Sequence, residues 1–263
     1  MSDVVDLDRR FGGLARLYGA QGAQNIRKAH VVVVGIGGVG SWAAEALARS
    51  GVARLTLIDM DHIAESNVNR QIHALSTTLG QSKVGAMQDR IAYINPDCDV
   101  RCIDEFVDAG NWPAVAQLAV ADELSLSVLD ACDQVRAKTA MAAWALESTA
   151  NFITVGAAGG KRHAHKVQID DIALVTHDPL LAQLRYRLRK EFGAARQGKM
   201  GVTGVFSPES VIQPTMIEDA PQTDNNLNCH GYGSVVSVTA TFGICAAGWL
   251  LDKIALGHLA KRS

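Results

Sequence analysis

The sequence of 263 residues lacks several features that would assign it to a class at once. Its five cysteines include no Cys-x-x-Cys pair, which argues against a disulfide framework and against a structural zinc site of paired thiolates. The 25 Lys and Arg residues nearly balance the 27 Asp and Glu residues, so contact with a nucleic acid would need a local basic patch. Residues 1–13 are too charged for the apolar core of a signal peptide. We therefore expect a protein of the reducing cytosol.

Only one stretch resembles a membrane span. Residues 235–251 carry no charge, but serine, threonine and glycine interrupt them, and the run is shorter than the roughly 20 apolar residues that a bilayer requires. We predict a buried core helix here, with membrane association as the less favoured alternative.

Short apolar strands alternate with helical segments along the first 160 residues. The run HVVVV at 30–34 is typical of a parallel strand that is buried on both faces. The other predicted strands are 53–59, 100–104, 125–130 and 152–155, and the predicted helices are 7–29 (one or two), 41–50, 82–94, 112–120 and 134–148. This alternation predicts an α/β, Rossmann-like fold with a mostly parallel sheet and helices on both faces.

We expect one domain over residues 1–263. An N-terminal helical segment (1–29) precedes a nucleotide-binding core (30–160), and a C-terminal extension (161–263) completes it. Within the extension, about 207–228 is rich in Pro, Gln, Asp and Asn, which predicts a long functional loop.

A glycine cluster follows the first predicted strand. Gly35, Gly37 and Gly40 fit the pattern G-x-G-x-x-G between a strand and a helix, where backbone N–H groups bind phosphate. Asp59 ends the next strand, where a carboxylate can hold ribose hydroxyls. The pattern predicts a nucleotide site, and an NAD-dependent dehydrogenase would share it.

Charged residues farther along favour a different chemistry. Hydride transfer needs no pair of cations at the phosphates, whereas adenylyl transfer spreads negative charge over a triphosphate that Arg70 and Lys83 could neutralise. Asp133 could hold Mg²⁺. Each residue alone is more simply a surface charge or a helix cap, and only their combination favours catalysis.

These motifs together resemble the ubiquitin-activating-enzyme-like ThiF/MoeB/HesA superfamily, whose members adenylate carboxylates with ATP and Mg²⁺. The matching segments are GxGGxGS at 35–41, DxD at 59–61, SNxxRQ at 66–71, GQxK at 80–83 and DxxD at 130–133. The sulfur-carrier activators of this superfamily usually carry zinc-binding Cys-x-x-Cys pairs, which are missing here. RFGGLARLYG at 10–19, NRQIHAL at 69–75 and VTATFG at 238–243 instead resemble the tRNA threonylcarbamoyladenosine dehydratases.

The resemblance implies a reaction and a set of residues. ATP would activate the carboxylate of the threonylcarbamoyl group next to the anticodon, and the carbamoyl nitrogen would then close a hydantoin ring with loss of AMP. The glycine loop with Ser41 would bind phosphate and Asp59 ribose, an N-terminal arginine would reach the ATP of a partner subunit, and a monovalent cation (Na⁺ or K⁺) is a further candidate cofactor. The implied residues are Gly35, Gly37, Gly38, Gly40, Ser41, Asp59, Asp61, Asn67, Arg70, Gln71, Lys83, Asp133 for Mg²⁺, and Arg10 or alternatively Arg16 for the partner's ATP.

Cys229 lies beside His230 just before the last predicted helix. The resemblance places a suspected catalytic cysteine here, and the helix dipole would favour its thiolate. Ring closure within one molecule needs no covalent enzyme intermediate, however, because the attacking nitrogen is already tethered. A catalytic thiol and a structural or redox role both stay open.

Two basic runs are the candidate tRNA contacts. One contains Lys161 and Arg162, and the other contains Arg185, Arg187, Arg189 and Lys190. A solvated helix face is the simpler explanation of such a run, but a tRNA substrate would need a local patch of this kind.

We expect a homodimer that acts on tRNA and not on DNA, with a cysteine desulfurase and its sulfur acceptor as further candidate partners. Two alternatives remain at this stage. The first is an activator of a ubiquitin-like sulfur-carrier protein, and the second is a non-catalytic nucleotide-binding scaffold for a desulfurase system.

Overall fold

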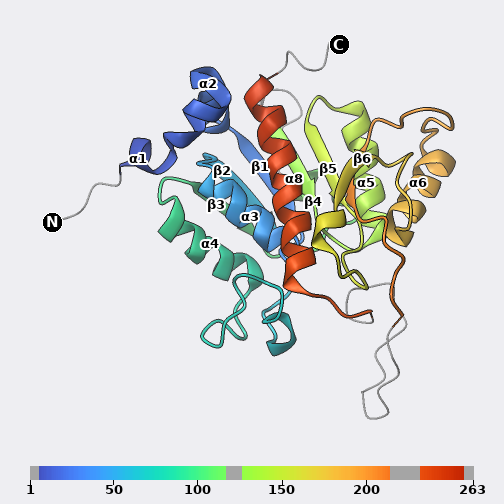
Figure 1. The fold of residues 1–263 in the computed structure, drawn as a ribbon, viewed down its shortest axis with the longest axis horizontal. Helices are drawn as coiled ribbons and strands as arrows, with labels where there is room; N and C mark the ends of the chain where they lie inside the picture. Colours follow the sequence, from blue (N-terminus) through green and yellow to red (C-terminus); the bar gives the residue numbers. More distant parts are fainter. Residues whose placement is uncertain (1–5, 117–125, 214–231, 258–263) are drawn as a thin grey trace.

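The computed structural model describes residues 6–116, 126–213 and 232–257, and it forms one seven-stranded sheet with helices on both faces (Figure 1). The helices are α1 (Leu7–Phe11), α2 (Gly13–Ile26), α3 (Gly40–Arg49), α4 (Lys83–Ile94), α5 (Val135–Glu147), α6 (Pro179–Glu191) and α8 (Val236–Leu256). The strands are β1 (His30–Val34), β2 (Arg54–Ile58), β3 (Asp99–Ile103), β4 (Leu126–Asp130), β5 (Asn151–Val155), β6 (Gln168–Asp171) and β7 (Thr203–Phe206). Single 3₁₀ turns are η1 (Glu65–Asn67), η2 (Ala114–Ala116) and η3 (Ala164–Lys166).

The strand order is β3-β2-β1-β4-β5-β7-β6, and only β6 runs antiparallel to its neighbour. Strands β2 and β4 pair with opposite edges of β1, so the chain builds the sheet outward from β1 first in one direction and then in the other. Ligands of such sheets bind beyond the carboxyl ends of the strands at this reversal. The predicted α/β, Rossmann-like fold is confirmed.

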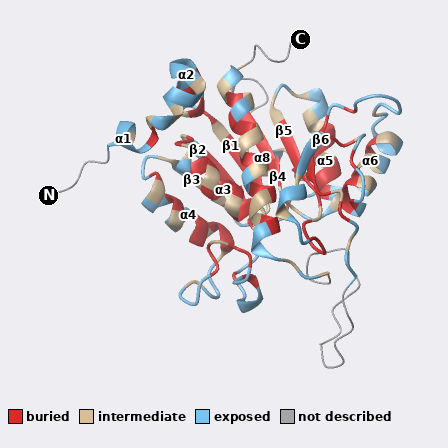
Figure 2. Ribbon diagram, in the orientation of Figure 1, coloured by how far each residue is buried: buried red, intermediate tan, exposed pale blue. Residues whose placement is uncertain are grey.

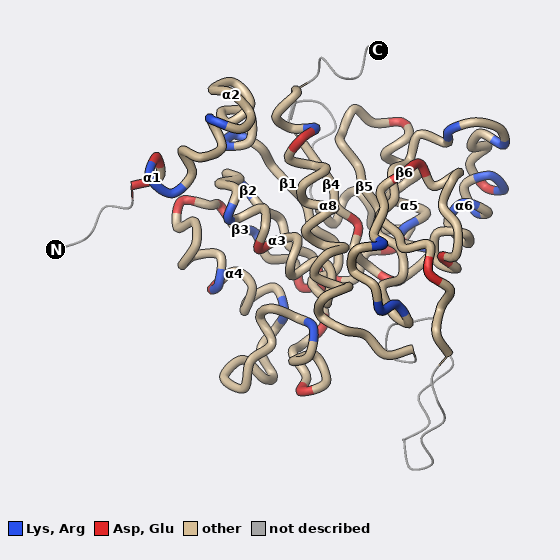
Figure 3. The backbone as a smooth tube through the Cα atoms, viewed as in Figure 1, with Lys and Arg blue, Asp and Glu red and all other residues tan. Residues whose placement is uncertain are grey.

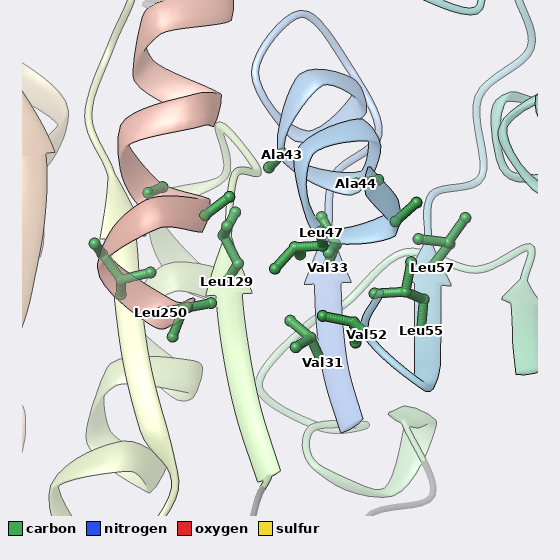
Figure 4. Packing of buried hydrophobic residues seen from close by; sticks show 14 of the residues in the cluster. Val31, Val33, Ala43, Ala44, Leu47, Val52, Leu55, Leu57, Leu129 and Leu250 are labelled. Carbon is green, nitrogen blue, oxygen red and sulfur yellow. The ribbon is translucent and has the colours of Figure 1, made fainter. Parts of the chain in front are cut away.

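Alternate residues of the strands face two separate cores, as expected for strands buried on both sides. Val31 and Val33 pack with Leu47 of α3 and Leu250 of α8 on one face (Figure 4). Val32 and Val34 pack on the other face against a cluster that includes α5 and α6. Figure 2 shows the buried strands between partly exposed helices.

Helix α8 is a core helix, as predicted. Val238, Phe242 and Leu250 are fully buried, and the helix packs against α3 and β5. Gly243 permits close packing, since a Cβ there would lie 2.3 Å from the carbonyl oxygen of Val39. Among the described residues, α8 is the one helix long and apolar enough to cross a membrane, but its buried face already has a protein partner.

The prediction of a helix over 112–120 was wrong where the structure describes it. Asp108 Oδ1 accepts from the backbone N–H groups of Gly110 at 2.6 Å and Asn111 at 2.9 Å, so the chain turns here. Pro113 follows, and only the single turn η2 forms. Residues 117–120 lie outside the described ranges, as does most of the predicted loop at 207–228. The strands β6 and β7 of the extension join the main sheet.

Candidate nucleotide-binding and catalytic site

A cavity of about 350 Å³ opens at the carboxyl ends of the central strands. It lies where β1, β2, β4 and β5 end, so the loops that follow these strands form its walls. Its polar and glycine lining includes Gly35, Gly37, Gly38, Asp59, Asp61, Arg70, Gln71, Lys83, Asp133, Gln134 and Thr239. Most of the residues predicted to bind a nucleotide therefore line one cavity.

The glycine loop is fastened to the next strand by Asp59. Its Oδ2 accepts from the backbone N–H of Ile36 at 2.6 Å, and its Oδ1 accepts from that of Asp61 at 2.9 Å. Gly35 has a φ of +85°, and a Cβ there would lie 2.9 Å from the backbone of Ala131, so the turn needs glycine. Burial raises the pKa of Asp59, while nearby Lys83 opposes that shift.

Lys83 is the first residue of α4, held in place by its N-cap. Ser82 Oγ accepts from the N–H of Gly85, which starts the helix at the cavity edge. Lys83 Nζ lies 2.6 Å from Asp61 Oδ2 and 4.0 Å from Asp59 Oδ1. The ammonium is therefore paired with a rim carboxylate that an incoming phosphate could replace.

Arg70 is buried, and its guanidinium is held in one orientation. Nη1 donates to the carbonyl of Ser66 at 2.6 Å and to Asn69 Oδ1 at 2.9 Å. Trp42 Nε1 donates to the Arg70 carbonyl at 2.9 Å, which fixes the backbone. A Cβ on Gly38 would lie 3.2 Å from Arg70 Cγ, so the arginine lies against the glycine loop. The geometry suits neutralisation of phosphate charge at that loop.

Below the cavity lies a fully buried polar network that the sequence did not indicate. Lys138 Nζ lies 3.1 Å from Asp130 Oδ2 and donates to Thr154 Oγ1 at 3.1 Å and to the carbonyl of Val155 at 2.8 Å. Thr154 Oγ1 donates to Asp130 Oδ2 at 2.6 Å. The network joins the ends of β4 and β5 to α5, and so supports the loop that carries Asp133.

The comparisons with known proteins agree with this geometry. The ThiF family model matches residues 9–261. The chain belongs to the ThiF family. It is 42% identical to the tRNA threonylcarbamoyladenosine dehydratase of Escherichia coli over 258 residues, which are 94% of this chain and 93% of that protein. It is 40% identical to the protein of the same name from Haemophilus influenzae over 260 residues, 97% and 96% of the two chains.

Solved structures give the same result. The Escherichia coli dehydratase in complex with ATP is 41% identical, superposes with a TM-score of 0.85 and covers 99% of both chains. Its complex with AMP has a TM-score of 0.83. The similarity to the molybdopterin-synthase adenylyltransferase of Salmonella typhimurium covers only 46% of this chain. The comparisons therefore place the chain among the tRNA threonylcarbamoyladenosine dehydratases, and they favour neither the sulfur-carrier alternative nor the scaffold.

Some residues that the family resemblance implied lie beside the cavity and not in its wall. Ser41 is fully buried, and its Oγ accepts from the N–H of Ile72 at 3.4 Å. Asn67 Oδ1 accepts from the N–H of Ala64 at 3.0 Å and thereby closes η1. Gly40 begins α3, where a Cβ would overlap the carbonyl oxygen of Gly35. The Ser41 hydroxyl and the Asn67 amide thus already have protein contacts, and their assignment to phosphate and the triphosphate stays a prediction.

Arg10 lies away from the nucleotide cavity of its own chain. It lines a second cavity of about 610 Å³ with Phe11, His73 and Tyr93, and its Nη1 donates to the carbonyl of Ile94 at 2.7 Å. Arg16 is exposed on α2. The structure therefore leaves the choice between these two arginines open.

Two of the predicted tRNA contacts bind backbone carbonyls, and the prediction was wrong for Lys161. Lys161 is buried, and its Nζ donates to the carbonyls of His177, Ser207 and Glu209. Burial lowers the pKa of Lys161. Arg185 donates through Nη1 to the carbonyls of Ile172 at 2.8 Å and Val175 at 2.9 Å. Buried Lys161 therefore cannot serve as a free phosphate contact, whereas Arg185 is partly exposed and engaged through Nη1, so its role stays a prediction.

The other basic residues keep more solvent contact. Arg162 and Lys190 are exposed, Arg187 pairs with Glu191 at 3.0 Å, and Arg189 Nε donates to the carbonyl of Ala195 at 3.3 Å. Figure 3 shows the basic residues of α6 at one edge of the molecule. Cys229 lies outside the described residues, so its role stays a prediction.

Proposed function

We propose that this protein uses ATP to cyclise threonylcarbamoyladenosine next to the anticodon of tRNA, with release of AMP and a net loss of water. The observation that carries the proposal is the convergence of Arg70 and Lys83 on a cavity that already contains the glycine loop and Asp59. Relatives that carry the dehydratase name, including one solved with ATP and with AMP, support it over nearly the whole chain.

The cavity offers partners for each part of ATP. Backbone N–H groups of the loop around Gly37 and Gly38 would receive phosphate oxygens at the start of α3. Asp59 keeps free lone pairs beside its two backbone hydrogen bonds, so it can also accept from ribose hydroxyls.

Adenylation follows from the charges at the rim. The substrate carboxylate attacks the α-phosphorus, and the bond to pyrophosphate breaks with the electron pair leaving on pyrophosphate. Lys83 would exchange Asp61 for a phosphate oxygen, while the side chain of Arg70 already lies against the glycine loop, with its Nη1 held by Ser66 and Asn69. Both cations are more favourable to the transition state than to the separated reactants, because charge builds up on the bridging oxygen as the bond breaks.

Asp133 fits a magnesium ion. Its exposed carboxylate lines the cavity, and Gln134 Nε2 donates to it only at 3.4 Å, so it keeps lone pairs for a ligand. The described residues contain no group of three or more His, Cys, Asp or Glu side chains that could hold a metal. The single free carboxylate of Asp133 suits Mg²⁺, which usually takes one or two carboxylates and completes its shell with phosphate and water. When bound, the ion would neutralise triphosphate charge.

Ring closure completes the proposed reaction. The carbamoyl nitrogen attacks the activated carbonyl carbon, loses its proton and displaces AMP. A catalytic role of Cys229 stays a prediction, because this step needs no covalent enzyme intermediate. A monovalent cation likewise stays a prediction.

The proposed tRNA substrate implies which residues contact RNA and which other molecules the protein meets. We expect action in the cytoplasm, where tRNA is modified, and the remaining candidates for tRNA phosphates are Arg162, Arg185, Arg187, Arg189 and Lys190. We also propose a homodimer, which the position of Arg10 outside its own nucleotide cavity supports. A cysteine desulfurase partner stays a prediction.

Mass spectrometry of nucleosides tests the function. Purified protein is incubated with ATP and tRNA that carries threonylcarbamoyladenosine, and the tRNA is digested under mild conditions. We expect a nucleoside lighter by one water with the wild type, and none without ATP or with Lys83→Ala. An unchanged nucleoside in all samples, together with adenylation of a small carrier protein, would revive the sulfur-carrier alternative.

A further inference from the structure

The first turn of α8 forms a wall of the cavity, next to Arg70. Thr239 lies in this turn, is only 2% exposed and lines the cavity. A Cβ on Gly38 would lie 3.2 Å from Arg70 Cγ and 3.5 Å from Thr239 Cβ. The glycine loop thus lies against both Arg70 and Thr239.

Asn69 fastens the start of α8 to the arginine. Its Oδ1 accepts from Arg70 Nη1 at 2.9 Å, while its Nδ2 donates to the carbonyl of Ser234 at 3.1 Å. One amide therefore joins the guanidinium to the segment that leads into α8, so the helix end and Arg70 are positioned together.

The hydroxyl of Thr239 is available to a ligand. A threonine inside a helix usually donates to a carbonyl one turn back, as Thr241 Oγ1 does to Ser237 at 2.7 Å. Thr239 Oγ1 makes only a 3.4 Å contact with the carbonyl of Val236. Its hydrogen can turn toward an acceptor in the cavity at little cost.

The same turn favours negative charge. Val235, the N-cap residue of α8, has no side-chain oxygen and makes no capping hydrogen bond. The N–H groups of Val238 and Thr239 donate to the carbonyl of Val235, whereas those of Val236 and Ser237 have no hydrogen bond to a described residue, and the helix dipole adds partial positive charge there.

Gln71 adds a second, different requirement. It lines the cavity and is 5% exposed, and its buried Oε1 has no hydrogen-bond partner within the described parts of the chain. An unpartnered buried acceptor calls for a donor in the ligand, and an ionised phosphate has none. The ligand next to Arg70 should thus present both an anionic oxygen and an N–H group.

We propose that Thr239 Oγ1 donates a hydrogen bond to the carboxylate of the threonylcarbamoyl group, while Gln71 Oε1 accepts from an N–H of the same group. The assignment rests on the proposed function. A carboxylate and an N–H on neighbouring atoms are the features that this group carries and that ATP phosphates lack. During ring closure the carboxylate oxygen that remains on the acyl carbon becomes the carbonyl oxygen, and it takes up negative charge as the nitrogen attacks. Thr239 then stabilises that oxygen until AMP departs.

The test compares Thr239→Val with Thr239→Ser, and uses Thr241→Val as the matched control in the same helix. Single-turnover cyclisation is measured with saturating ATP and modified tRNA, and ATP affinity is measured by calorimetry. We expect Thr239→Val to slow cyclisation by about 10-fold to 100-fold, since one hydrogen bond to a charged group is lost. ATP affinity should stay unchanged, Thr239→Ser should restore most of the rate, and Thr241→Val should match the wild type.

Gln71→Met tests the acceptor, and we expect slower cyclisation at unchanged ATP affinity here too. Wild-type rates in Thr239→Val and Thr239→Ala would overturn the assignment, and so would weaker ATP binding, which would assign Thr239 to the nucleotide. If urea unfolding shows that Thr239→Val does not fold, the single-turnover cyclisation rates of Thr239→Ser and Thr239→Ala decide whether the assignment holds. Failure of the wild type to cyclise the nucleoside would remove the proposed function itself, and that result needs no variant.

Discussion

Two lysine–aspartate pairs at the same end of the sheet differ in their surroundings. At the cavity rim, Lys83 lies 2.6 Å from Asp61, whose side chain is 55% exposed. Beneath the cavity, Lys138 lies 3.1 Å from Asp130, and both side chains are fully buried. The rim pair can exchange a partner for phosphate, whereas each polar atom of the buried pair already has fixed protein partners. The exposure of the aspartate, and not the residue type, therefore separates a pair that can exchange partners from a structural pair.

The largest effect should come from breaking the buried pair. Lys138→Met keeps a similar volume but leaves the charge of Asp130 without its counter-charge in the interior. The free energy of unfolding should fall by about 3–5 kcal/mol, measured by urea unfolding followed by circular dichroism. Adding Asp130→Asn should recover part of the loss, because a neutral amide needs no counter-charge. Wild-type stability of Lys138→Met would contradict the comparison.

The two cations that line the cavity, Lys83 and Arg70, should show the opposite pattern. Lys83→Ala or Arg70→Ala should each remove about 3–4 kcal/mol of transition-state stabilisation, which lowers the rate by a few orders of magnitude. Lys83→Ala should cost less stability than Lys138→Met, because solvated Asp61 can stay ionised without the lysine. Single-turnover rates with saturating ATP check the first claim, and urea unfolding checks the second. A wild-type rate in both variants would remove these residues from the site.

His73 extends the comparison to a buried side chain whose ring has no hydrogen-bond partner among the described residues. Both of its ring nitrogens lack hydrogen bonds in the described residues, and burial, followed by the charges of Lys83 and Arg90, lowers its pKa to about 4. The unfolded chain binds a proton near pH 6.5, before the folded chain does, so stability should fall as the pH drops from 6.5 to 4. The expected loss is about 3 kcal/mol.

Urea unfolding at pH 7 and pH 4.5 measures how the free energy of unfolding changes with pH, and His73→Gln should make that change smaller. An equal change in the wild type and His73→Gln would mean that other groups carry the acid sensitivity.

The sequence was sufficient for the fold and for the residues that meet at the strand ends. The run HVVVV and the glycine cluster predicted β1 and the loop after it, and parallel strands bring their carboxyl ends to one edge, so Asp59, Arg70 and Lys83 converge. Whether a given basic residue is buried or exposed was not predictable, because the sequence around Lys138, Lys161 and Arg162 does not distinguish them. Their surroundings depend on contacts between distant segments, such as Lys161 with the carbonyl of Ser207.

The smallest effects, residue by residue, should come from cations at the surface. Arg162 and Lys190 are exposed, whereas the neighbouring Lys161 and Arg185 hold backbone carbonyls. Neutralising both exposed residues to Gln should weaken tRNA binding and flatten its dependence on salt, because each lost phosphate contact reduces counterion release. ATP affinity and stability should stay unchanged.

Filter binding from low to moderate salt checks this, with Lys161→Gln as the contrasting variant. Lys161→Gln should lower stability, because buried carbonyls lose their donor, and its salt slope should equal that of the wild type. A slope unchanged by neutralising Arg162 and Lys190 would move the RNA surface elsewhere, with Arg187 and Arg189 next to test. A weaker salt dependence of tRNA binding in Lys161→Gln would instead show that this buried cation still acts on RNA. Burial would then not distinguish structural cations from RNA-binding ones at this surface.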